Sequence, residues 1–267
     1  MLLNSVIIIL REVLEVALLI SVLLAFSKQL NLSYRWVVWS VGLGFSGAFA
    51  YAAIITTVSE WFEGVGQEVT NALLQFGIYI LLLVFIAMAL QQFKRTEVRL
   101  RFITLIMAVI VSLAITREGS EILIYLNNFI QVTDHFPAVL SGSVIGAGIG
   151  CSVGIIVYYL FCNVIPRWSV NAGIILLILI AAGMISQASL LLIQADWLPS
   201  QLPLWNSSEF ISEESVVGQL LYAVIGYEAT PTPIQAGFYL GGLILLTILF
   251  WIINRTSTSS SKTDQLS

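Results

Sequence analysis

Seven long apolar stretches run through this chain and leave little of it for anything except membrane helices. A stretch of about 20 apolar residues is long enough to cross a bilayer as a helix. Only 10% of the residues are charged, whereas a soluble domain carries about 25%. Because this deficit extends over the whole length, most of the surface must face lipid. We therefore predict an all-α polytopic membrane protein.

The predicted spans form one seven-span domain over residues 1–254. A polar, Ser/Thr-rich tail, 255–267, follows and is expected to be disordered in the cytoplasm. Because Arg11 and Glu12 interrupt the first stretch and no basic leader precedes it, we expect a retained membrane helix and not a signal peptide. The net charge of −4 gives no indication of a nucleic-acid partner. The spans lie near 2–26, 36–58, 72–92, 102–126, 140–163, 169–195 and 234–254.

The loops between the spans separate by charge. Nine of the eleven Lys and Arg residues lie on one side of the predicted membrane, and the other two lie within helices. The opposite side carries acidic residues and neither Lys nor Arg. Because basic loops remain in the cytoplasm, we predict a multi-pass protein of the cell membrane with its N-terminus outside and its C-terminus inside.

The one long outer loop, 196–233, contains a predicted surface helix at 213–225. Ser212 is its expected N-cap, and Glu213 and Glu214 suit its positive N-terminal end. Apolar residues recur along one face, and this stripe is expected to rest on the bundle or on the membrane interface. The stripe consists of Val216, Val217, Leu220, Leu221, Val224 and Ile225.

A glycine recurs at every fourth position of the fifth span. This spacing places the four glycines on one helix face, where a neighbouring backbone can approach closely. We expect this face to serve packing and not to identify a substrate. The glycines are Gly142, Gly146, Gly150 and Gly154.

Two short charged motifs lie inside the first and fourth spans. A charge near the bilayer centre costs about 2.5–3.5 kcal/mol on the insertion scale, so such residues are functional by default. Residues three and four apart share a helix face, which places the charged groups of each motif together. The motifs comprise Arg11, Glu12 and Glu15 in the first span, and Arg117, Glu118 and Glu121 in the fourth.

The predicted topology makes the two motif helices antiparallel, which indicates an inverted repeat relating spans 1–3 to spans 4–6. In inverted-repeat transporters the substrate site lies near the midplane, at the repeat interface. If the motifs meet there, four glutamates and two arginines leave an excess of two negative charges for a cation. Sites built only from carboxylates suit hard ions such as Ca²⁺, Mg²⁺, Mn²⁺ and Fe³⁺.

Softer ligands are not expected in this site. The single histidine, His135, falls in an outer loop and is predicted to be a loop residue. Cys151 and Cys162 are separated by eleven residues, a helical rise of about 16 Å that is too long for a disulfide.

Simple ion pairs are the alternative explanation of the two motifs. Arg11 with Glu15, and Arg117 with Glu121, could make buried charges tolerable. Such ion pairs would leave Glu12 and Glu118 without partners. The same charged pattern would also have to occur by chance in two separate spans.

The segments Arg11-Glu-Val-Leu-Glu15 and Arg117-Glu-Gly-Ser-Glu121 resemble the paired Arg-Glu-x-x-Glu motifs of the oxidase-dependent iron transporter family. This family includes the fungal high-affinity iron permeases and the bacterial inner-membrane iron permeases. The resemblance implies inward transport of iron, typically Fe³⁺ from a partner ferroxidase or from a periplasmic iron-binding protein. Iron would be the transported substrate, with no permanently bound cofactor.

Carried over by position, the resemblance assigns roles to both motifs. Arg11 and Arg117 would orient the carboxylates and limit their repulsion in the empty site. The iron ligands would be Glu12, Glu15, Glu118 and Glu121.

The sequence departs from the family pattern at a few positions. Val13 replaces the usual Gly and Ser120 the usual Leu, and neither change removes a charge. Before the third span, relatives carry two carboxylates, whereas this chain keeps only Glu68 and has Asn71 at the second acidic position. Glu68 is therefore the candidate residue for outer iron capture.

Other functions remain compatible with the residues alone. One is a permease for another hard divalent cation such as Mn²⁺, and another is a proton-coupled carrier that uses the same glutamates. A third is an intramembrane di-metal enzyme, although such centres usually add Glu-x-x-His pairs and no predicted span contains a histidine. A fourth is a membrane scaffold for an extracellular oxidase. The oligomeric state is open.

Overall fold

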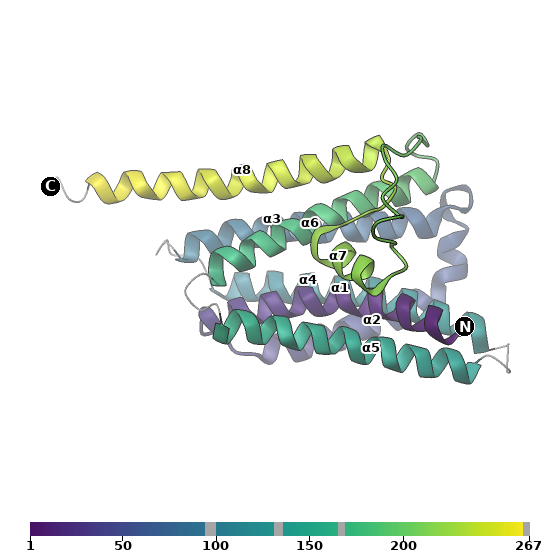
Figure 1. Ribbon diagram of the computed structural model, residues 1–267. Helices are drawn as coiled ribbons and strands as arrows, with labels where there is room; N and C mark the ends of the chain where they lie inside the picture. The colour runs from purple at the N-terminus through teal and green to yellow at the C-terminus, as the bar shows by residue number, and fades with distance from the viewer. Residues whose placement is uncertain (94–99, 131–135, 165–168, 264–267) are drawn as a thin grey trace.

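The computed structural model describes residues 1–93, 100–130, 136–164 and 169–263. Within these ranges the chain is all-helical, as predicted, and its long helices lie side by side in one bundle (Figure 1). The α-helices are α1 (Leu2–Gln29), α2 (Arg35–Ser59), α3 (Gly66–Phe93), α4 (Leu100–Ile130), α5 (Phe136–Tyr159), α6 (Ser169–Gln194), α7 (Val216–Ile225) and α8 (Pro233–Thr263). A 3₁₀ turn, Trp61–Gly64, precedes α3, and a π-helical turn, Leu160–Val164, continues α5.

Six of these helices are long and apolar enough to cross a membrane, namely α2, α3, α4, α5, α6 and α8. Each overlaps one of the predicted spans. The remaining predicted span, 2–26, corresponds to α1, which has 28 residues but is interrupted by Arg11, Glu12 and Glu15. The structure therefore has helices at all seven predicted positions and continuous apolar spans at six.

Successive long helices run in alternating directions (Figure 1). The end of α1 and the start of α2 lie at the same end of the bundle as the C-terminus, and they carry Lys28 and Arg35. The end of α2 and the start of α3 lie at the opposite end, near the N-terminus, and this region carries Glu60, Glu63 and Glu68. Basic and acidic helix ends are thus separated along the bundle axis.

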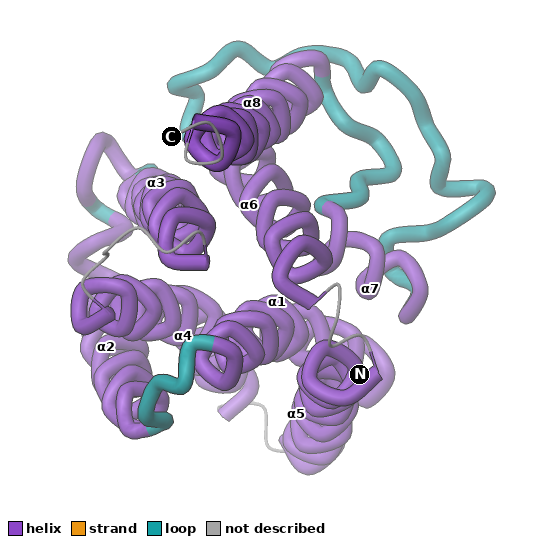
Figure 2. The backbone as a smooth tube through the Cα atoms, turned by 90° about the vertical axis from the view of Figure 1, so that its left-hand side faces the viewer, coloured by secondary structure: helices purple, strands orange, loops and turns teal. Residues whose placement is uncertain are grey.

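Helix α1 lies near the middle of the bundle, with α4, α5 and α6 around it (Figure 2). The predicted glycine face of α5 packs directly on α1, and Ser21 Oγ of α1 donates a hydrogen bond to the carbonyl oxygen of Gly154 (2.7 Å). Helix α2 packs on α4 in a similar way, since Ser112 Oγ donates to Ser40 O (3.1 Å). Close backbone contact therefore fixes both motif helices.

Because α5 packs closely on α1, we expect alanine substitutions at two glycines of α5 to differ in their effect on stability. A Cβ added at Gly146 would lie 2.5 Å from the carbonyl oxygen of Val6, a backbone atom that cannot move aside cheaply. Gly146→Ala should therefore destabilise the protein by about 1–3 kcal/mol, measured as a lower thermal midpoint in detergent. Gly148→Ala is the matched control, because no atom lies within 4 Å of its Cβ position. Equal midpoints for both variants would contradict the close contact.

Helix α7 corrects the predicted surface helix at 213–225. It begins only at Val216, and its N-cap is Ser215, whose Oγ accepts from Gly218 N (3.0 Å), and not Ser212. The residues before it turn instead, since the carbonyl oxygen of Ser212 accepts from Ser215 N (3.0 Å) and the Glu213 carboxylate accepts from the backbone of the loop after α7.

The buried face of α7 also differs from the predicted apolar stripe. Val216 and Val217 of that stripe are exposed. The buried residues are Gly218, Gln219, Tyr222 and Ala223. Helix α7 contacts α1 and α6, whereas Gly218 and Gln219 lie against the preceding loop, where Gln219 Nε2 donates to the carbonyl oxygen of Glu213. Leu220 and Val224 of the predicted stripe do pack against the hydrophobic core. The hydrophobic periodicity of α7 alone could not reveal that Gln219 would be buried against the loop.

Helix α8 includes part of the tail predicted to be disordered, and the disorder itself stays a prediction. Helix α8 continues to Thr263, ten residues beyond the last apolar position, Ile253. No proline or glycine follows Gly242 in this helix, and an established helix adds one hydrogen bond for each further residue fixed. The polar composition of the segment therefore did not end the helix.

Candidate metal site

The two charged motifs meet where α1 contacts α4 in the middle of the bundle. Glu12, Glu15 and Glu118 are all buried there, and Glu118 is only 1% exposed. Each offers a carboxylate oxygen, and these three oxygens lie within 4.8 Å of one another. A hard cation takes oxygen ligands at about 2.0–2.6 Å, so oxygens on opposite sides of an ion are about 4–5 Å apart. The three glutamates are therefore close enough to share one cation.

Arg117 is the central cation of this cluster. It is 5% exposed and forms ion pairs with Glu15 (Nη1–Oε2, 3.5 Å), with Glu118 through Nη1, and with Glu121 (Nη2–Oε1, 3.4 Å). One guanidinium thus contacts carboxylates from both motifs. The predicted pair of Arg117 with Glu121 exists, but it is one of three.

Arg11 is placed differently. Its Nε lies 3.7 Å from Glu15 Oε1, so the predicted pair is a loose one, and its side chain is 35% exposed. The guanidinium carbon lies 3.7 Å from the centre of the Tyr222 ring on α7. The two arginines of the duplicated motif therefore have different surroundings.

Two oxygens of the cluster are buried without a hydrogen-bond donor among the described residues: Glu15 Oε1 and Glu118 Oε2. A buried acceptor left without a partner costs about 1–3 kcal/mol, and more when it is charged. A bound cation would satisfy both oxygens. The possible ligand atoms of the described cluster are carboxylate oxygens, which hard cations prefer over thiolate and imidazole.

Glu121 is separated from the three clustered glutamates. Its side chain is 29% exposed and accepts a hydrogen bond from Asn71 Nδ2 (3.2 Å). It lies in the wall of an open cavity of about 350 Å³. The cavity lies among the N-terminal part of α3 and the C-terminal parts of α4 and α6, and its lining includes Gln67, Glu68, Asn71, Glu121, Tyr125 and Asn128. Arg117 joins this cavity to the buried cluster, because it pairs with glutamates on both sides.

Asn71 bridges Glu121 of α4 and Tyr51 of α2. Its amide nitrogen donates to Glu121, and its amide oxygen lies 3.4 Å from the Tyr51 hydroxyl, which donates to it. A carboxylate at this position would face Glu121 with the same charge. Glu68 lines the same cavity and retains one buried oxygen without a partner among the described residues.

Two buried glutamines were missed by the sequence analysis. Gln75 of α3 donates to Gln187 of α6, and Gln187 lines a narrow gap together with Glu15 and Tyr222. Both are polar residues inside predicted spans, a signal that indicates helix–helix contact in membranes. Tyr222 gave no comparable signal.

Among the described residues, no histidine or cysteine belongs to the glutamate cluster. His135 is outside the described residues. Cys151 is an exposed free thiol, and Cys162 is a partly buried one.

Comparison with known proteins assigns the family. Residues 2–255 match the sequence profile of the Iron permease FTR1 family, which is nearly the whole chain. No curated protein and no solved structure matches the chain. The match covers both motifs and all the long helices as far as Arg255. The chain therefore belongs to the Iron permease FTR1 family and is a multi-pass membrane transporter of iron, not an enzyme.

Proposed function

We propose that this permease carries iron, in the ferric form, inward across the cell membrane by binding it between Glu12, Glu15 and Glu118. The observation that carries the proposal is that three buried glutamates from both motifs each have a carboxylate oxygen within 4.8 Å of the other two. Two of these glutamates, Glu15 and Glu118, also have a buried oxygen without a donor among the described residues. Iron would replace the missing donors. Arg11 and Arg117 would hold the ligands apart and balance their charge in the empty state.

Iron would reach this cluster through the cavity that Glu68 and Glu121 line. Glu121 is suited to receive the ion first, because its carboxylate is partly exposed in the cavity wall. Glu68 and the acidic outer segments would raise the local concentration of cations. An extracytoplasmic ferroxidase or iron-binding protein would supply the ion at this end.

If Glu68 only attracts iron to the cavity, its loss should lower the apparent affinity for iron and leave the maximal uptake rate unchanged. Glu68→Gln should raise the iron concentration for half-maximal uptake by roughly fivefold, because unit charges about 4 Å apart interact by about 1 kcal/mol even in bulk water. The maximal rate should stay the same. Glu63→Gln is the matched control, since it removes an exposed charge from the same end without lining the cavity. A lower maximal rate in Glu68→Gln, or equal effects in both variants, would contradict this role.

Transport requires the helices to move. On the other side of the cluster, Leu18, Leu19, Val22 and Leu23 of α1 are fully buried in a continuous apolar core with residues of α3, α4 and α6. Partly dehydrated iron could not cross this packing, because burying a charge without partners is too costly. This closed inner half supports a carrier that opens its two sides in turn and argues against a static pore.

The proposed carrier has seven spans over residues 1–254, with α1 as the first, its N-terminus outside and its C-terminus inside. The alternating helix directions and the separation of basic from acidic helix ends support this topology. The helix contacts support an inverted repeat. If α1–α3 correspond to α4–α6, the contact between α1 and α5 has its counterpart in the contact between α4 and α2, and both occur.

The experiment that tests the function is flux into proteoliposomes containing the purified protein, with defined Fe³⁺ or Fe²⁺ and with or without a proton gradient. We expect Fe³⁺ uptake that Mn²⁺, Zn²⁺ and Ca²⁺ inhibit only weakly. Preferential Mn²⁺ flux would favour the divalent-cation alternative. Uptake that ceases without the gradient would add proton coupling, and iron binding without flux would favour a scaffold.

A further inference from the structure

Arg11 is held by a residue that belongs to neither motif. Its guanidinium carbon lies 3.7 Å from the centre of the Tyr222 ring. Tyr222 is on α7, far along the chain, and is only 8% exposed. A guanidinium over an aromatic face is attracted by the ring quadrupole, and the attraction is strongest where water is excluded. The contact is therefore a substantial restraint on Arg11.

This restraint competes with Glu15 for the same guanidinium. Arg11 Nε is 3.7 Å from Glu15 Oε1, which is beyond hydrogen-bond distance. Glu15 Oε1 accordingly has no donor among the described residues. Tyr222 and Glu15 line the same narrow gap between α1, α6 and α7. Arg11 thus rests on the aromatic ring while the nearby carboxylate oxygen remains open.

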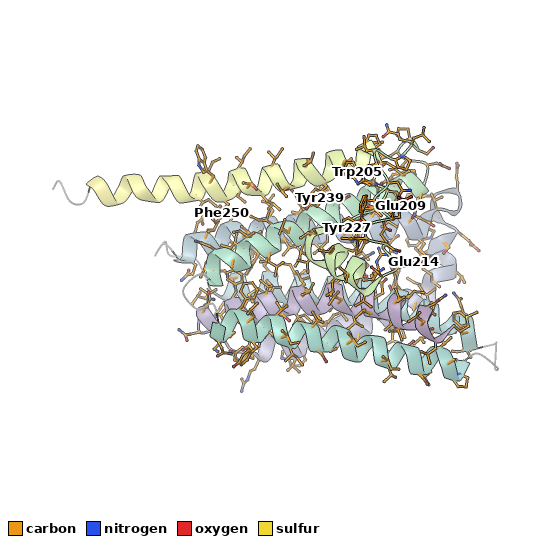
Figure 3. The ribbon with its side chains drawn as sticks, viewed as in Figure 1. Trp205, Glu209, Glu214, Tyr227, Tyr239 and Phe250 are labelled. Carbon is orange, nitrogen blue, oxygen red and sulfur yellow. The ribbon has the colours of Figure 1, made fainter. Side chains whose placement is uncertain are left out.

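The position of Tyr222 is fixed by the fold independently of Arg11. The Tyr239 hydroxyl of α8 donates to the carbonyl oxygen of Ile225 at the end of α7 (2.7 Å), and Figure 3 shows Tyr239 in this region. Gly226 follows with φ 68°, a left-handed conformation that favours glycine. Its backbone packs on Gly183 of α6, where a Cβ at Gly226 would lie 2.5 Å from the Gly183 Cα. Helix α7 is therefore anchored to α6 and α8.

We propose that Tyr222 is a positioning residue of the metal site, whose ring holds Arg11 away from Glu15 so that Glu15 Oε1 stays open to the cation. This inference rests on the proposed function of the glutamate cluster. Helix α7 lies outside both halves of the proposed repeat, and its role in this proposal is to position Arg11. This positioning also explains why the duplicated arginines differ, since Arg117 forms ion pairs with three glutamates.

Removing the ring should weaken iron binding without changing the maximal transport rate. In Tyr222→Leu, Arg11 is free to close on Glu15 and compete with iron. We expect the half-saturating Fe³⁺ concentration in proteoliposome uptake to rise about two- to fivefold, the equivalent of a cation–π contact to a partly exposed arginine. Tyr222→Phe keeps the ring face and is expected to stay close to the wild type. Tyr222→Met is a second ring-free variant, should the leucine variant fail to reach the membrane.

A double-mutant cycle separates positioning from general damage to α7. In an Arg11→Gln background, Tyr222→Leu should cause no further rise, because no guanidinium remains to be positioned. Tyr239→Phe, which removes an anchor of α7 without touching Arg11, should leave the half-saturating concentration unchanged. A rise that persists in the Arg11→Gln background, or an unchanged value in Tyr222→Leu, would overturn the proposal. Normal uptake by Glu15→Gln would instead overturn the proposed function itself.

Discussion

Arg117→Leu is expected to remove most of the folded protein from the membrane. Arg117 is 5% exposed and pairs with Glu15, Glu118 and Glu121. Its loss would leave Glu15 and Glu118 buried with no compensating charge beside them except the loosely placed Arg11. Removing one partner of a buried ion pair costs about 3–5 kcal/mol, which is a large part of the total stability of a typical domain.

The measurement is the thermal midpoint of the purified protein in detergent, together with the amount recovered from membranes. Arg101→Leu is the matched control, since it removes an exposed arginine from the first turn of the same helix. We expect a normal yield and midpoint for the control. An unchanged midpoint in Arg117→Leu would mean that the cluster does not depend on this guanidinium.

The second large effect is on transport. Glu15→Gln and Glu118→Gln should each reduce iron uptake by roughly a hundredfold or more, because losing even an outer-shell partner of a metal ligand costs 10–100-fold. The substitution preserves side-chain shape and leaves an oxygen that can still accept from Arg117. The protein should therefore fold while losing the negative charge that binds iron. Glu121→Gln is expected to have a similar effect, because Glu121 links the outer cavity to the cluster.

Radiolabelled iron uptake in cells, normalised to the protein in the membrane, measures this effect. Glu214→Gln serves as the control, because it neutralises an exposed glutamate of the outer segment. Glu209 and Glu214 both lie in this segment, which precedes α7 (Figure 3). Normal uptake by a correctly inserted Glu15→Gln/Glu121→Gln double variant would refute transport through the motifs.

The long helices could be predicted from single-residue properties, whereas spacing and charge left open whether the two motifs meet. Apolar length sets the helices, and the cost of isolated charges in a bilayer requires Arg11, Glu15 and Arg117 to find polar partners inside the bundle. The spacing of Gly142 and Gly146 likewise predicted a close helix contact. That contact is with α1.

The division within the predicted ligand set could not be derived from spacing. Glu15 and Glu121 occupy equivalent motif positions, yet only Glu15 joins the buried cluster, whereas Glu121 turns toward Asn71 and the outer cavity. The helix pattern fixes which face a residue occupies. It does not fix which neighbours that face meets, and here α3 meets α4 at Glu121.

Helix α7 shows the same limit more strongly. Its periodicity predicted an apolar stripe that rests on the bundle or on the membrane interface. Val216 and Val217 of this stripe are exposed on the protein, whereas Tyr222 and Gln219 are buried. A helix of ten residues owes its placement to its tertiary partners and not to its own pattern. The partner of Tyr222 is Arg11, which lies on α1, far from α7 along the chain.

The most direct test of the central claim is an anomalous difference map, recorded at the iron absorption edge, from crystals of the iron-loaded protein. A peak within coordinating distance of the carboxylates of Glu12, Glu15 and Glu118 is the predicted result, and the same map from Glu15→Gln should lack it. A peak confined to the outer cavity near Glu68, or one at the cluster that survives in Glu15→Gln, would contradict binding between the three glutamates.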